Sequence, residues 1–244
     1  MVTKTETLYA YVLHRRPYQE RGALLELMSE RGRLSVVTRK DLAHPFQLLW
    51  LELAGRGELK TLRRCEPVGP AVFPEGMALY AGLYLNELTY RLLPREWDHP
   101  SLWQLYRQTC SQLLIADARA IEAALRRYEL ELLQGRGDEH RLTHTRGGEP
   151  IRAQERYRWD PRHGFSVAIE GIPGSSLQAM ACADFTQEEV LQQARSIFRA
   201  MIDHALGGRT LHARQLYRQA LATRDPDSVL GGDMTGQQPV QPVR

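Results

Sequence analysis

The hydrophobic pattern of this chain changes period near residue 76, and this change constrains the fold more than any other feature. Before residue 76, short apolar segments alternate with turn residues, which is typical of β-strands. Five strands in under 70 residues predict a small closed barrel. The expected strands span residues 8–13, 23–28, 33–39, 46–53 and 58–68, with a polar break at residues 15–22.

After residue 76 the apolar residues recur with helical spacing. Helices are expected at residues 77–93, 101–114 and 117–133, the first apolar on nearly all sides and therefore central. Thr186 and Glu189 have the spacing of a capping box, which predicts the start of a helix that ends at Gly207 and Gly208. A last short helix is expected at residues 210–221.

The predicted fold class is α+β, a barrel followed by a helical domain that carries a small insertion. Residues 138–175 are polar and rich in turns, with short extended pieces at 156–159 and 165–169. The tail contains few apolar residues and is expected to be disordered. The expected domains are 1–75 for the barrel, 76–137 with 186–222 for the helices, 138–185 for the insertion and 223–244 for the tail.

Several functional classes find little support in the sequence. No apolar run approaches the length of a membrane span and the first 13 residues do not resemble a signal peptide, so a cytoplasmic location is expected. The chain has no catalytic motif such as GxSxG or HExxH, and residues 55–61 lack phosphate-loop spacing, so we expect no enzyme and no cofactor. His140, His144, His163 and Cys182 have poor metal-ligand spacing, so no metal is expected.

Positive charge is concentrated at the N-terminus. Residues 1–68 hold 12 Lys and Arg against 8 Asp and Glu, whereas the other 176 residues hold 20 against 21. Each cation alone is typical of a solvated surface, but a barrel gathers several on one side, with Tyr9, Tyr11 and Tyr18 as stacking surfaces. The predicted DNA-binding residues are Arg15, Arg16, Arg33, Arg39, Lys40, Arg56, Lys60, Arg63 and Arg64.

Seven blocks follow one another between residues 8 and 221: YVLHRRPYQE (11–20), GRLSVVTRK (32–40), PF (45–46), GRGELKTLR (55–63), LYAGLYLNEL (79–88), ALRRYEL (124–130) and LGGRTLHARQLYRQ (206–219). In this order they resemble the signatures of RecO, a family of bacterial recombination mediators. The resemblance implies an OB-fold, a helical domain and an embedded zinc-ribbon-like insertion. It also implies binding of single- and double-stranded DNA, annealing, and partnership with RecR and the single-stranded DNA-binding protein SSB, so that RecA loads onto gaps.

Two departures from the family pattern stand out. Only residues 41–45 separate two barrel strands that a longer basic loop joins in many members. The four clustered cysteines that ligate zinc in some members are also missing, which predicts a zinc-free insertion.

The family resemblance also suggests where SSB docks. The acidic, apolar tail of SSB needs an apolar pocket rimmed by cations, and the expected site comprises Arg126, Arg127, Tyr84 and Leu88. In the alternative, the two arginines form ordinary helical pairs with Glu129 and Glu131. The chain is expected to be a monomer when alone, and the competing function is a protein adaptor whose barrel binds a repair partner instead of DNA.

Overall fold

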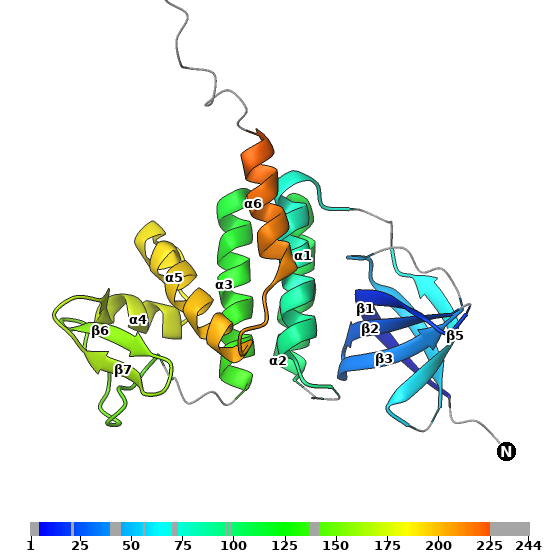
Figure 1. The fold of residues 1–244 in the computed structure, drawn as a ribbon, viewed down its shortest axis with the longest axis horizontal. Coiled ribbons are helices and arrows are strands. Elements are labelled where there is room, and N and C mark those ends of the chain that lie inside the picture. The colour runs from blue at the N-terminus through cyan, green and yellow to red at the C-terminus, as the bar shows by residue number, and fades with distance from the viewer. Residues whose placement is uncertain are drawn as a thin grey trace, which may run out of the picture.

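The computed structural model describes residues 5–20, 22–39, 45–55, 57–69, 73–95, 97, 99–136 and 142–224. Two of the predicted DNA-binding residues, Lys40 and Arg56, and residues 225–244 of the predicted tail lie outside this part, as does His140. Figure 1 shows the barrel beside an array of helices, with a small sheet at the opposite end of the molecule.

The N-terminal part is a closed five-stranded barrel, which confirms the predicted OB-type fold. Its strands are β1 (Thr5–Tyr18), β2 (Gly22–Ser29), β3 (Gly32–Thr38), β4 (Leu49–Ala54) and β5 (Leu59–Pro67). They follow the order β1-β2-β3-β5-β4, and β3 and β5 pair in parallel. Apolar residues at alternate positions fill the interior, among them Leu8, Leu25, Val36, Leu51 and Leu62.

Strand β1 runs through the segment predicted as a polar break, so that prediction was wrong. An irregularity between Val12 and His14 shifts the register, after which β1 pairs with β2 as far as Tyr18 and Gly22. Proline has no N–H group to donate to a neighbouring strand. Strand β1 tolerates Pro17 because β4 pairs only with residues 5–10 of β1, so at Pro17 only the edge that faces β2 is paired.

The outer face of β1, β2 and β3 packs against the helices. Tyr11, Leu13 and Met28 belong to the same buried cluster as the helical residues Trp103 and Tyr106. At the edge of this contact Arg95 donates a hydrogen bond to the buried carboxylate of Glu26 over 2.9 Å, and Ser35 donates another over 3.0 Å. The barrel is therefore joined to the helices through an apolar and a polar contact.

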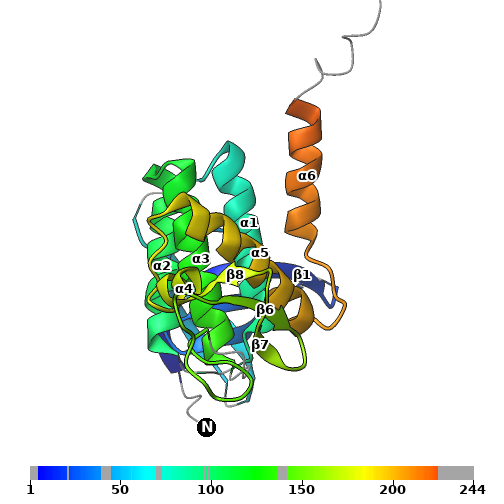
Figure 2. The ribbon, with the colours of Figure 1, turned by 90° about the vertical axis from the view of Figure 1, so that its left-hand side faces the viewer.

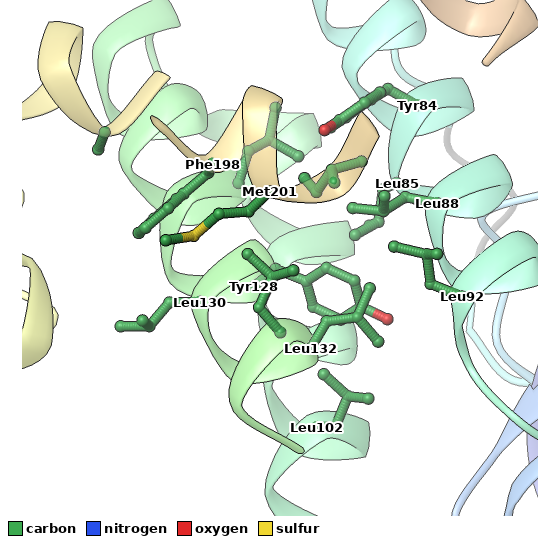
Figure 3. Close-up of a cluster of buried hydrophobic side chains, with 14 of the residues drawn as sticks. Tyr84, Leu85, Leu88, Leu92, Leu102, Tyr128, Leu130, Leu132, Phe198 and Met201 are labelled. Atoms are coloured by element: carbon green, nitrogen blue, oxygen red, sulfur yellow. The ribbon is translucent and has the colours of Figure 1, made fainter. Parts of the chain in front are cut away.

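The helical body consists of α1 (Gly76–Leu92), α2 (Pro100–Ile115), α3 (Ala118–Gly135), α5 (Glu188–Ala205) and α6 (His212–Arg224). Helices α1 and α3 lie side by side, and α6 stands against α1 (Figures 1 and 2). Between them Leu85, Leu88, Tyr128 and Leu132 are fully buried, and Figure 3 shows these side chains converging from α1 and α3. Gly207 and Gly208 have positive φ angles of 59° and 86° and follow the end of α5, as predicted.

The insertion contains more regular structure than the sequence suggested. Strands β6 (Arg156–Asp160), β7 (Gly164–Val167) and β8 (Ile172–Pro173) form a sheet of order β7-β6-β8, and helix α4 (Gly174–Ala181) follows. The sequence did not predict α4. The predicted capping box is also wrong, because Thr186 donates its hydroxyl to Asp184 while Gln187 is the N-cap of α5.

Candidate nucleic-acid and partner interfaces

Three of the predicted DNA-binding cations gather at one end of the barrel. Arg16 pairs with Leu24, Leu24 with Val37, and Val37 with Thr61, so these residues form one row across four strands. Arg39 and Arg63 each lie two residues beyond this row, Arg39 directly after the end of β3 and Arg63 within β5. Arg15, Arg16, Arg39 and Arg63 are all exposed.

Arg33 does not belong to this group. The sequence predicted that its side of β3 faces outward, but helix α1 covers that side. Arg33 donates a hydrogen bond to the carbonyl oxygen of Tyr90 over 2.5 Å and its guanidinium lies 5.4 Å from the centre of the Tyr90 ring. Burial lowers the pKa of Arg33, and nearby Glu26 opposes this effect. In this position Arg33 joins the barrel to the helices.

Two further cations of the barrel are paired with acidic residues. Lys60 lies 3.5 Å from Glu6, which also accepts a hydrogen bond from Arg31 over 2.7 Å. Arg64 forms a 2.5 Å ion pair with Glu66. These pairs offset part of the positive charge along β5, whereas Arg16, Arg39 and Arg63 remain exposed.

A second candidate site lies in the helical body. A cavity of about 530 Å³ opens between α1, α3, α5 and α6. Apolar side chains such as Ile121 and Leu125 form part of its wall. Its polar lining is dominated by arginines from three helices, namely Arg126 of α3, Arg195 and Arg199 of α5, and Arg214 and Arg218 of α6.

A buried carboxylate anchors the floor of this cavity. Oε1 of Glu129 accepts hydrogen bonds from the Tyr84 hydroxyl over 2.6 Å and from Arg126 Nη2 over 2.8 Å. Burial raises the pKa of Glu129, although Arg126 and the bond from Tyr84 act in the opposite direction. Burial also raises the pKa of Tyr84, so Tyr84 stays a neutral donor.

The remaining arginines differ in how firmly they are held. Arg195 forms two hydrogen bonds to Glu122, of 2.7 and 2.5 Å. Arg214 pairs with Asp203 and lies over the Tyr84 ring. The side chain of Arg199 is 60% exposed and lies 3.9 Å from Asp203, and Arg218 is also exposed. Arg199 and Arg218 are therefore the cations best placed at the rim to meet an acidic ligand.

The structure brings only part of the predicted partner site together. Tyr84 and Arg126 line the cavity, but Arg127 and Leu88 do not. Leu88 is fully buried and points into the core between α1 and α3 (Figure 3). Arg126 also makes the ordinary helical pair with Glu129 that was the alternative interpretation.

Four arginines of the cavity were not among the predicted partner residues. Arg214 and Arg218 lie in the block at residues 206–219, and Arg195 and Arg199 are spaced i, i+4 along α5. That spacing places them on one face of the helix, a signal that could have identified them.

Neither a metal-ligand cluster nor a membrane-spanning helix is found among the described residues. Among them, no group of three or more His, Cys, Asp or Glu side chains is placed to hold a metal ion. His163 lies 2.9 Å from Asp160, and His144 is within hydrogen-bond distance of Thr143. In the same part of the chain, no helix combines the length and the apolar character needed to cross a membrane.

The barrel and the helical body define a two-domain protein of the class that joins an OB-type fold to a helical domain. Residues 75–215 match the family model described as "Recombination protein O C terminal". The chain is 41% identical over 218 residues to the DNA repair protein RecO of Stutzerimonas stutzeri (strain A1501), covering 85% of this chain and 92% of that protein. It is 37% identical over 230 residues to the DNA repair protein RecO of Shigella flexneri, covering 88% and 95%. The chain belongs to the RecO family, and its role lies in DNA repair and recombination.

Proposed function

We propose that this chain is a recombination mediator that binds single- and double-stranded DNA on its barrel and anneals complementary strands. With RecR, it helps to load RecA onto DNA coated by SSB. The observation that carries this proposal is the separation of two surfaces, because the exposed arginines of the barrel and the arginine-lined cavity lie in different domains. Such a protein holds a strand and a protein partner at the same time.

Annealing on the barrel needs no nucleotide hydrolysis. Part of the charge of two phosphate backbones is neutralised by Arg16, Arg39 and Arg63, which lowers the repulsion between the strands. Base pairing then provides the driving force. This step uses no catalytic side chain, and we propose that the protein acts without one.

The cavity in the helical body suits the tail of SSB, which is acidic and ends in hydrophobic residues. Ile121 and Leu125 offer apolar contact, while Arg199 and Arg218 attract the acidic part of the tail. Glu129 fixes Arg126 at the floor, so that arginine is already oriented when the tail arrives.

The experiment is annealing of complementary strands, bare and SSB-coated, without ATP. The wild-type protein is expected to accelerate both reactions. The double variant Arg199→Glu with Arg218→Glu should slow only the SSB-coated reaction. The triple variant Arg16→Glu, Arg39→Glu and Arg63→Glu should slow both reactions. No acceleration of either reaction by the wild-type protein would contradict the proposal.

The second candidate function is an adaptor whose barrel binds a repair protein. It is favoured by the ion pairs of Lys60 with Glu6 and of Arg64 with Glu66, which weaken the positive field on that side. If the chain is an adaptor, a protein partner should still bind after charge reversal at Arg16, Arg39 and Arg63. The wild-type protein should then show no measurable affinity for DNA.

A further inference from the structure

Two aromatic rings lie next to each other on the outer face of the barrel. Tyr9 of β1 and Trp50 of β4 are direct cross-strand partners. Their neighbours Leu8, Ala10, Leu49 and Leu51 point into the barrel core, so the two rings point outward. Tyr9 is 43% exposed and Trp50 is half-buried.

The third strand adds a cation to this pair. The guanidinium of Arg64, on β5, lies 5.7 Å from the centre of the Trp50 ring, a cation–π distance. Arg64 pairs across the strands with Glu52, and Trp50 pairs with Glu66. We call Tyr9, Trp50 and Arg64 the outer-face triad.

The triad marks the part of the barrel that the helices leave uncovered. Tyr11 has the same outward orientation as Tyr9, yet it is only 6% exposed because it packs against Trp103 and Tyr106. The boundary of the helical body therefore runs between Tyr9 and Tyr11. Figure 1 shows β5 on the side of the barrel away from the helices.

We propose that the outer-face triad stacks an unpaired base of bound nucleic acid, with Tyr9 and Trp50 as the platform. This inference rests on the proposed binding of DNA by the barrel and adds to it the surface that distinguishes single strands from duplexes. A base in a duplex has its faces covered by its neighbours, whereas an unpaired base presents a face to an aromatic ring.

The surroundings of the triad favour a base over a folded protein. The adjoining outward residues Thr7, Glu52 and Glu66 are polar. The exposed apolar area consists of the two rings and of Val68, which is 41% exposed and bonds to Leu48 beside Trp50. An area of this size matches a base, whereas a protein interface needs a larger apolar centre. The carboxylate of Glu66 is paired with Arg64, and that of Glu52 repels phosphates. The proposed path of the DNA backbone therefore follows exposed Arg63 while the base turns toward Trp50.

The test uses the full chain and two oligonucleotides of about 12 residues, one of thymidines and one entirely abasic. Both carry the same backbone charge, so the difference in their affinities isolates the contribution of the bases. The wild-type protein is expected to prefer the thymidine oligonucleotide by about tenfold or more. The double variant Tyr9→Ser with Trp50→Ala should lose this preference while its affinity for the abasic strand stays the same.

Trp50→Phe is the matched control, because phenylalanine keeps a ring face but removes the tryptophan signal. It should retain the preference for thymidines, and quenching of tryptophan fluorescence by the oligonucleotide should decrease sharply. This second measurement decides the matter if the double variant does not fold. Equal wild-type affinity for both oligonucleotides, or quenching that is unchanged in Trp50→Phe, would overturn the stacking role but leave phosphate binding by the barrel intact. Failure of the wild-type protein to bind either oligonucleotide would remove both proposals.

Discussion

Arg126 and Glu129 form a buried ion pair within helix α3, with 2.8 Å between Nη2 and Oε1 and side chains that are 9% and 1% exposed. Removing one partner of a buried pair leaves the other charge without compensation, and this usually costs more than the pair contributes. We therefore expect Glu129→Ala to lower the free energy of unfolding by about 3 kcal/mol. Glu129→Gln keeps an acceptor and should cost about 1 kcal/mol, as measured by urea denaturation. Equal costs would show that the acceptor at this position does not matter.

The same carboxylate predicts a pH dependence. Burial raises the pKa of Glu129 above the value of about 4.3 that a glutamate has in the unfolded chain. A raised folded-state pKa means that the favourable contribution of the group is complete below the unfolded value and is lost as pH rises through the folded value.

Relative to Glu129→Gln, which does not titrate, the wild-type protein should therefore lose stability as pH rises above about 4.3. Free energies of unfolding of the two proteins across this pH range provide the measurement. If the free energy of unfolding of the wild-type protein increases with pH relative to that of Glu129→Gln, the assigned direction of the pKa shift is wrong.

The cavity makes a specific prediction about SSB. Arg199→Glu together with Arg218→Glu should weaken binding of an SSB tail peptide by about tenfold or more, because two attractive charges become repulsive. Arg127→Glu changes a cation of α3 that does not line the cavity, and it should leave peptide affinity nearly unchanged. Fluorescence anisotropy with a labelled peptide measures both. A larger loss of peptide affinity in Arg127→Glu than in the double variant would show that the peptide binds on the other side of α3.

The contact between barrel and helices offers another test. Glu26 is 1% exposed and accepts hydrogen bonds from Arg95 and Ser35. Arg95→Ala should destabilise the protein by about 1 to 3 kcal/mol, because a buried carboxylate loses a charged donor. The double variant Arg95→Ala with Glu26→Gln should recover part of this loss. Recovery is the informative outcome, since an Arg95 side chain that only packs against its surroundings would give additive losses.

The sequence predicted the barrel and the helical body because both depend on local hydrophobic periodicity. It did not predict the extension of β1, which depends on pairing with β2 beyond an irregular register, or α4, which is only eight residues long. The position of Arg33 was missed for a different reason. Alternation along β3 gives the direction of its side chain but not the presence of Tyr90 above it, since that contact joins residues 57 positions apart.

The salt dependence of binding measures whether the barrel holds single-stranded DNA through its exposed arginines. With four to six cations engaged, the logarithm of the binding constant should fall with the logarithm of salt concentration at a slope of about −3 to −4. Reversing Arg16, Arg39 and Arg63 together to glutamate should make this slope shallower by about 2 and weaken binding. A wild-type slope near zero, or the same slope and affinity in the triple variant, would show that these arginines do not hold the DNA.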